Sequence, residues 1–176
     1  MNERADSTKE RLMAAFAETP YPGNENLVIG GDPECRRVAS AFEGKNWKEV
    51  TAEMLRTYGD ALPLLTPAAF RYYLPAYMTG CVDAYYDVDV ALDGVIFNLT
   101  PPPRRSGWRW DHFWTRVQQF DDKERAAIVS FLRLMQQYDD ADWASEGKKP
   151  PMDRVAGGLA FWTELTSTGS PPSGAQ

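Results

Sequence analysis

The chain has 176 residues, of which 43% are hydrophobic and 25% are charged, and its formal net charge is −6 at pH 7. This length and balance suit one soluble globular domain that needs neither a metal nor a disulfide to fold. The negative charge argues against a sequence-independent nucleic-acid binder, because such proteins need a basic face to neutralise phosphates. It would instead steer a basic partner towards the protein.

The sequence gives no sign of a targeting or membrane segment. Residues 1–8 lack the apolar stretch of a signal peptide, and no run approaches the roughly 18 apolar residues of a membrane span. The two cysteines, Cys35 and Cys81, lie in apolar helical stripes and lack any paired spacing. We therefore expect buried free thiols and a protein of the reducing cytoplasm.

Two helices are predicted in the first quarter of the chain. The first is expected to begin at Ser7, which has the spacing of a capping box with Glu10. The second begins at Asp32-Pro33, which supplies an N-cap followed by proline at the first helical position. Between these helices, residues 27–29 form a short apolar run. Both a stray strand and a buried loop segment remain open for it.

The next two helices lead to the centre of the chain. Thr51 is predicted to cap a short helix that ends at Pro63, and Thr66-Pro67 starts the central helix in the same way as Asp32-Pro33 does. Pro75 interrupts the central helix, so we expect either one kinked helix or two abutting ones. Its apolar and aromatic residues recur at i, i+3 and i+4 through four turns, at positions 70, 73, 74, 77, 78, 81, 82 and 85.

Three further stripes of helical spacing follow. The first covers residues 88–99 and is terminated by three prolines, and the second covers residues 110–117. Asp121 and Glu124 have the spacing of a capping box ahead of the third stripe, which covers residues 128–135.

The C-terminal end combines one more helix with a polar tail. The last helix is expected to run from Asp153 to about Leu165, and residues 167–176 have the composition of a disordered tail. The predicted fold is therefore all-α, with residues 1–166 forming a single-domain bundle of about six to eight helices. A short strand or extended segment near residues 27–29 is the one departure left open.

No metal, cofactor or catalytic site is predicted. His112 is the only histidine, and the two cysteines are far apart, so no zinc-ligand spacing exists. The acidic residues between Asp83 and Asp93 fail the calcium-loop pattern, because the loop positions that need an oxygen ligand and a glycine hold Ala91 and Leu92.

Two groups of acidic residues are candidate contacts for a cationic partner. Asp83 and Asp87 belong to a carboxylate-bearing face that spans the end of one helix and the start of the next. Asp139 and Asp140 are expected just beyond the helix of residues 128–135, where the helix dipole disfavours negative charge. Solvated loop residues are the alternative interpretation of Asp139 and Asp140.

The segment of residues 103–110 is a candidate protein-contact loop. It contains three arginines and two tryptophans, the residue types that most often carry binding energy at interfaces. Trp108 and Arg109 are the residues that we expect to contact a partner. In the alternative interpretation, the tryptophans fold back on the core and the arginines pair with acidic helices.

Three stretches resemble a family of small bacterial proteins of unknown function. They are Phe42-x-Gly44-x-x-Trp47, the sequence Thr-Pro-x-Ala-Phe-x-Tyr-Tyr-Leu-Pro-Ala at residues 66–76, and Phe120-x-x-x-Glu124. The resemblance covers roughly residues 20–138. It implies no activity, cofactor or site residue. Small acidic bacterial proteins often neutralise toxins, an analogy at the level of class only.

Two functions are therefore weighed. The first is a non-enzymatic binding protein, for example of the immunity type, whose protein partner would be a basic toxin domain. Neither a nucleic acid nor a membrane is expected as a partner. The oligomeric state is left open. The alternative is a small-molecule-binding or enzymatic helical domain with a tyrosine-lined pocket. That pocket would use Tyr72, Tyr73 and Tyr77, with charge from Arg71 or Glu34. The partner-binding residues of the first hypothesis are Asp83, Asp87, Asp139, Asp140, Trp108 and Arg109.

Overall fold

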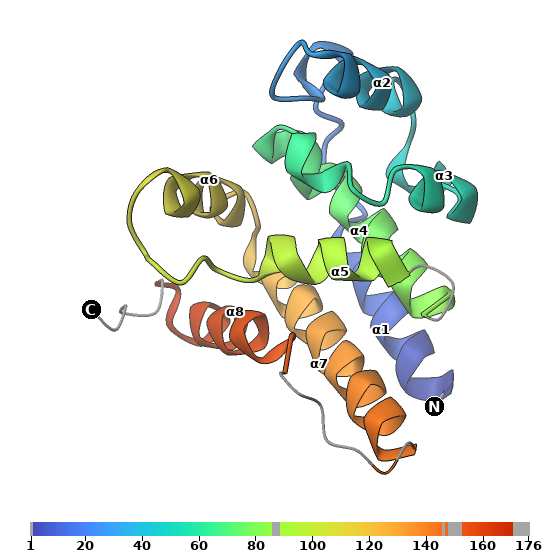
Figure 1. The fold of residues 1–176 in the computed structure, drawn as a ribbon, viewed down its shortest axis with the longest axis vertical. Helices are drawn as coiled ribbons and strands as arrows, with labels where there is room; N and C mark the ends of the chain where they lie inside the picture. Colours follow the sequence, from blue (N-terminus) through green and yellow to red (C-terminus); the bar gives the residue numbers. More distant parts are fainter. Residues whose placement is uncertain (1, 86–88, 146, 148–152, 171–176) are drawn as a thin grey trace.

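The computed structural model describes residues 2–85, 89–145, 147 and 153–170 (Figure 1). Over these residues the chain forms eight α-helices and three short 3-10 turns, and the described part contains no strand. The prediction of an all-α bundle of about six to eight helices is confirmed. The helices are α1 (Asn2–Ala15), α2 (Pro33–Phe42), α3 (Ala52–Thr57), α4 (Pro67–Asp83), α5 (Asp89–Leu99), α6 (Trp108–Val117), α7 (Asp122–Ser145) and α8 (Ala156–Thr168).

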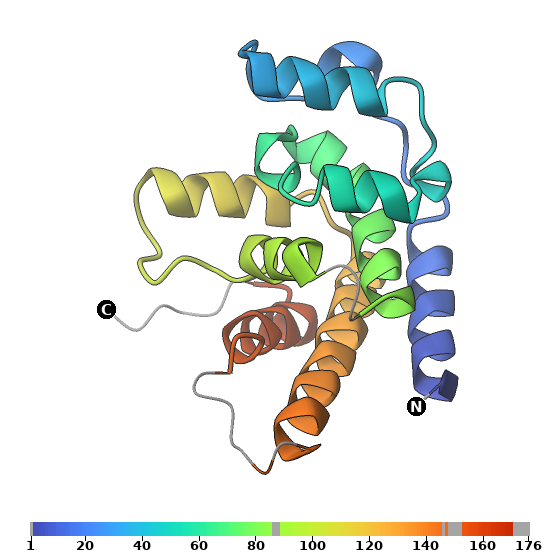
Figure 2. The ribbon, with the colours of Figure 1, turned by 45° about the vertical axis from the view of Figure 1, so that its right-hand side comes forward.

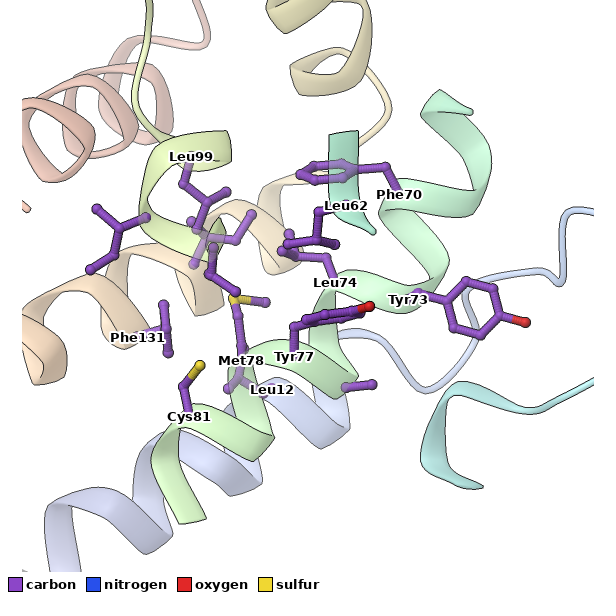
Figure 3. Close-up of a cluster of buried hydrophobic side chains, with 14 of the residues drawn as sticks. Leu12, Leu62, Phe70, Tyr73, Leu74, Tyr77, Met78, Cys81, Leu99 and Phe131 are labelled. Carbon is purple, nitrogen blue, oxygen red and sulfur yellow. The ribbon is translucent and has the colours of Figure 1, made fainter. Parts of the chain in front are cut away.

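The central helix of the bundle is α4, which contacts α1, α3, α5 and α6. Its side chains are apolar on most sides, and nearly all of those between Ala69 and Val82 are buried. Figure 3 shows Met78 and Cys81 of this helix pointing towards Leu12 of α1 and Phe131 of α7. The central position of α4 is what its long apolar stripe predicts, because such a helix must be covered on several faces.

The helices α1, α7 and α8 lie side by side, with α7 between the other two (Figures 1 and 2). Arg4 donates to Gln137 at 2.9 Å and Arg11 donates to Ser130 at 3.3 Å. Since the residue number rises on α1 as it falls on α7, these two helices are antiparallel. The other end of the molecule is covered by α2 and α3.

The predicted helix starts are confirmed where a polar side chain caps the first turn. Asp32 accepts hydrogen bonds from the backbone N–H groups of residues 34 and 35, at 2.9 and 3.0 Å. Thr66 accepts from the N–H of residue 69 at 3.1 Å. Asp121 and Glu124 form the full capping box, each side chain accepting from the backbone N–H of the other at 2.9 Å. Each cap supplies partners for N–H groups that a helix leaves unpaired.

Pro75 lies inside one continuous helix, so the choice between one helix and two is settled in favour of one. A proline in a helix interior removes a backbone hydrogen bond and costs about 3 kcal/mol. Leu74, Ala76 and Tyr77 around it are buried, and their packing offsets that cost. The hydroxyl of Thr79 donates to the carbonyl of Pro75 at 2.8 Å.

Residues 27–29 form an extended segment with one bridge. The N–H of Ile29 donates to the carbonyl of Leu64 at 2.9 Å, and the N–H of Thr66 donates to the carbonyl of Leu27 at 3.0 Å. Val28 and Leu65 thereby form an isolated antiparallel bridge. The extended-segment alternative therefore describes these residues, and Leu27 anchors them in the core.

Two predicted boundaries in the N-terminal half are wrong. α1 begins at Asn2 rather than Ser7, because its first turns already pack on α7 and need no capping box at Ser7. α3 ends at Thr57 rather than continuing towards Pro63, and a separate 3-10 turn follows at Leu62–Leu64. Leu55 holds α3 against α4 at Gly80, where a Cβ would lie 2.0 Å from its Cδ1 atom.

Two boundaries in the C-terminal half also differ from the prediction. α6 begins at Trp108, so Trp108 and Arg109 form the first turn of a helix instead of a loop. α7 continues to Ser145, so Asp139 and Asp140 are helix residues instead of loop residues beyond it. In both cases the helix extends past the apolar stripe from which its length was inferred.

The C-terminal helix α8 runs to Thr168, two residues past the domain boundary expected at 166. Within the predicted tail, residues 171–176 lie outside the described residues. Among the helices that are described, none combines the length and apolar character needed to cross a bilayer.

Candidate functional site

Arg154, in the segment before α8, forms the centre of an ion cluster that joins α5 and α7. Its guanidinium donates to both carboxylate oxygens of Asp139 on α7, at 2.7 and 2.8 Å, and also contacts the carboxylate of Asp93 on α5. The hydroxyl of Tyr85 donates to Asp139 at 2.6 Å. Asp139 is therefore a structural residue whose charge is already bound.

The environment of Asp139 keeps it ionised. Burial alone would raise the pKa of Asp139, but the hydrogen bonds from Arg154 and Tyr85 and the charge of Arg154 outweigh burial and lower the pKa below its ordinary value. The same contacts, led by the hydrogen bond to Asp139, raise the pKa of Arg154. The cation beside Asp139 is Arg154 of the same chain. Contact of Asp139 with a partner stays a prediction.

The other predicted acidic contacts are placed differently. Asp83, at the end of α4, forms an ion pair with Lys9 at 2.5 Å and its side chain is 53% exposed. Asp140 is exposed on α7. Asp87 lies outside the described residues. Of this group, only Asp140 presents its carboxylate to solvent with no ion pair among the described residues.

The first turn of α6 presents an exposed aromatic side chain. Gly107 has a φ of 80°, a conformation that favours glycine, and it turns the chain into the helix. Trp108 follows and is 73% exposed. The guanidinium of Arg109 lies 5.3 Å from the centroid of its ring, within the range of a cation–π contact. Both residues therefore remain available to a partner.

The remaining aromatic residues of this segment face inward. Trp110 stacks on Trp114 with ring centroids 5.7 Å apart, and it meets Phe161 of α8 edge-on. The guanidinium of Arg105 lies 5.8 Å from the ring centroids of Trp110 and Phe161. The interpretation in which the tryptophans fold back therefore describes Trp110, whereas Trp108 points outward.

The five predicted contact residues that the structure describes do not form one site. Trp108 and Arg109 lie at the start of α6, whereas Asp139 and Asp140 lie near the far end of α7, in a different part of the molecule (Figures 1 and 2). The local charge also differs: exposed Arg104 and Arg109 flank the positive N-terminal end of α6. This surface favours a neutral or acidic contact.

The tyrosines of the alternative hypothesis are core residues. The hydroxyl of Tyr73 lies 2.7 and 2.9 Å from the carbonyl oxygens of residues 42 and 45, and the hydroxyl of Tyr77 donates to the carbonyl of Tyr58 at 2.7 Å. Tyr72 is 4% exposed, and burial raises the pKa of all three phenols. Figure 3 shows Tyr73 and Tyr77 on α4 beside the apolar core.

The charged residues of that alternative have other contacts. The Nε atom of Arg71 lies 2.9 and 3.0 Å from the two carboxylate oxygens of Glu124, which is 1% exposed. Glu124 also accepts from the hydroxyl of Thr19 at 2.8 Å. Glu34 is exposed on α2. Arg71 therefore compensates a buried carboxylate of the capping box.

Arg116 is a buried cation that the sequence analysis missed. Its guanidinium donates to the side chain of Asn98 at 2.9 Å and to the carbonyls of Pro63 and Leu65 at 2.9 and 3.0 Å, and it lies 4.6 Å from the ring centroid of Phe70. No carboxylate among the described residues pairs with it, and burial lowers its pKa to about 10. Its position on the apolar stripe of α6 was the signal that could have identified it.

The described residues offer no metal centre: no group of three His, Cys, Asp or Glu side chains among them is placed to hold an ion. Both cysteines are free and buried. The exposed helix surfaces are where this chain could contact other molecules. Trp108 is the most exposed aromatic residue of α6.

Comparison with known proteins identifies the family. A family model described as "Family of unknown function (DUF6714)" matches residues 31–155, which is more than half of the chain and includes α2 to α7. The chain therefore belongs to this family. No curated protein and no solved structure matches it.

Proposed function

We propose that this member of the DUF6714 family is a non-enzymatic binding protein that contacts a protein partner through Trp108 and Arg109. One observation carries the proposal: a tryptophan that is 73% exposed stands at the start of a helix whose buried face, Phe113, Arg116 and Val117, packs on the core. Tryptophan and arginine are the residues that most often contribute large binding energies at interfaces.

The surroundings of Trp108 support a preformed contact surface. Arg105 lies against Trp110 and Phe161, so the segment that precedes the helix is held to α8. Arg109 lies over the Trp108 ring. A side chain that is already held near its bound position loses less conformational entropy on binding.

The charge of this surface favours a partner whose contact region is acidic or neutral. Arg104 and Arg109 are exposed, and the N-terminal end of α6 adds a partial positive charge. A carboxylate of the partner near Arg109 would form a charge-assisted hydrogen bond, while an apolar side chain would cover Trp108.

A second proposal, which uses a surface other than that of Trp108 and Arg109, is an immunity-type role in which the chain covers a basic toxin domain. The net charge of −6 supports it, because that charge would speed the approach of a basic protein. Asp140 is the acidic candidate with the most freedom to contact such a partner. A cytoplasmic location fits the two free, buried thiols.

The test is recovery of a stoichiometric complex from cells that produce the protein. Wild-type chain should retain its partner, and Trp108→Ala should weaken the complex by about thirtyfold, which corresponds to the roughly 2 kcal/mol of an interface hot spot. Phe97→Ala is the matched control, since Phe97 is also exposed, at 75%, but lies on α5.

Two results would contradict the proposal. One is a complex that Trp108→Ala leaves intact while Phe97→Ala disrupts it. The other is the absence of any stoichiometric complex together with a rise in melting temperature on addition of a small metabolite, which would favour the ligand-binding alternative.

A further inference from the structure

Three adjoining hollows follow the seam between α1, α7 and α8. The largest, of about 450 Å³, lies between the first half of α1 and the middle of α7. A second, of about 400 Å³, lies between the end of α1 and the start of α7, and a third, of about 260 Å³, lies between α7 and α8. The first two hollows follow one another along the seam of α1 with α7 and are named here the α1–α7 groove; the third adjoins it on the α8 side of α7. Arg11 lines all three and crosses the seam to donate to Ser130.

Alanines line the second hollow of the α1–α7 groove, whereas the buried side chains of Thr8 and Leu134 lie in the lining of the largest. Alanine and serine on both helices leave the backbones close to the surface, where another helix could approach them at a short interaxial distance. Glu124 and the aromatic residues of the core do not line it. The small lining residues are Ser7, Ala14, Ala15, Ala126, Ala127 and Ser130.

The charged residues of the α1–α7 groove are nearly all cations. Arg4, Arg11, Lys123 and Arg133 line it, whereas Glu3 is its only carboxylate among the described residues. The groove is positively charged although the net charge of the chain is −6. The groove is therefore a local exception to the overall charge.

No ion pair within the described residues involves these four cations. Arg4 and Arg11 donate only to the neutral side chains of Gln137 and Ser130. Within the described part of the chain, Arg133 forms no hydrogen bond or ion pair. Elsewhere Lys9, Arg71 and Arg154 each hold a carboxylate.

We propose that the α1–α7 groove is a docking site for an acidic amphipathic helix of a protein partner. Such a helix would lay its small apolar face on the alanines and direct its carboxylates to the arginines on either side, which is the helix-in-groove mode of recognition. The seam from Arg4 to Ala15 is about 17 Å long at 1.5 Å per residue, enough for about three helical turns of the partner.

Charge excludes a second copy of this chain as the occupant of the same groove. Two copies that met groove to groove would bring Arg11 and Arg133 of one against the same cations of the other, and like charges at an interface are unfavourable. The elongated shape, which follows the seam of two antiparallel helices, fits a helix better than a compact ligand.

A defined peptide tests the proposal. The probe is a fluorescein-labelled 15-residue peptide made of two Ala-Glu-Glu-Ala-Ala-Glu-Glu repeats and a final alanine, which places the alanines on one face of a helix. It is titrated with the full chain and followed by fluorescence anisotropy. The comparison peptide carries lysine in place of every glutamate. The net charge of −6 alone would favour the lysine peptide, whereas the α1–α7 groove favours the glutamate peptide.

Variants locate the binding. Arg133→Glu should weaken binding of the glutamate peptide by about fivefold to tenfold, the effect of reversing one exposed charge contact. Arg104→Glu changes the net charge equally outside the groove and should leave the affinity within about twofold. Arg133 is exposed and makes no contact whose loss would unfold the protein.

The proposal is independent of the α6 surface, so Trp108→Ala should leave peptide binding unchanged. It is overturned if the glutamate peptide fails to bind at 1 mM, if the lysine peptide binds as well, or if Arg133→Glu and Arg104→Glu behave alike. Binding of the chain to anionic phosphatidylglycerol vesicles without binding to the glutamate peptide would also overturn it, in favour of a membrane surface.

Discussion

Charged side chains serve different purposes in two regions of this molecule. Around Arg154, cations and carboxylates of α5, α7 and the segment before α8 pair with one another. In the α1–α7 groove, Arg4, Arg11 and Arg133 have neutral partners or none. The difference shows that net charge does not locate a binding surface. A charged side chain that already forms an ion pair within the chain gains little from a further contact with a partner.

The largest effect is expected from a third kind of charge, the buried Arg116. Arg116→Ala removes the donors of two backbone carbonyls and of Asn98 and leaves a cavity, so it should lower the free energy of unfolding by about 3 kcal/mol or more. Urea denaturation measures this loss. Arg109→Ala on the same helix is the control, and an equal effect of the two substitutions would show that Arg116 is not a structural residue.

The comparison of the two regions is tested next by removing one cation from each. Arg154→Ala leaves the carboxylate of Asp139 half-buried without its partner and should cost about 2 kcal/mol, reduced from the value for a fully buried pair by solvent screening. Arg133→Ala should change the free energy of unfolding by less than about 0.5 kcal/mol. Equal losses in urea denaturation would contradict the distinction.

The pH dependence of stability sharpens the same contrast. Because the folded-state pKa of Asp139 lies below its ordinary value of 3.8, this residue contributes stability that is fully present above that value and is lost as the pH falls through the folded pKa. Unfolding followed by circular dichroism should therefore show a loss of stability below pH 3.8. The loss should be smaller in Asp139→Asn, and an unchanged acid profile in that variant would refute the assignment.

The smallest effect concerns the thiol of Cys81, which lies on α4 and is fully buried. Burial raises its pKa to about 12, so it should not react with a thiol reagent at neutral pH in the folded wild-type chain. The charge of Arg154 lowers this pKa, so Arg154→Ala removes a contribution that favours the reactive thiolate, and faster labelling of this variant would report opening of the core around the cluster. Arg133→Ala should leave the rate unchanged. Rapid labelling of wild type would mean that this part of the core opens readily.

Local signals were sufficient to predict the fold class and several helix starts. Asp32, Thr66 and Asp121 act as caps because the capping interaction spans only two or three residues, which the sequence displays directly. The end of α7 was missed because its last turns, up to Ser145, carry few apolar residues, and its length was inferred from the apolar stripe. The local stop signal is Gly147, whose φ of 66° is typical of a glycine just past a helix end.

The contact surfaces were harder to predict because they depend on residues far apart in the sequence. Asp139 looked available for a partner until the fold placed Arg154 beside it. The α1–α7 groove combines Arg11 with Arg133, more than a hundred residues away, and no linear motif reports such a pairing. Composition alone suggested an interface at Trp108 and Arg109; the structure shows that both are exposed, and their contact with a partner stays a prediction.

The close approach of Leu55 to Gly80 has a consequence for the order in which the molecule assembles. α3 has only six residues, too few to persist in water by themselves. α3 is held as a helix because Leu55 packs into the space that Gly80 leaves on α4. Its amide protons should therefore exchange with solvent whenever α4 detaches from it. We expect α3 to form late in folding and to unfold early on heating.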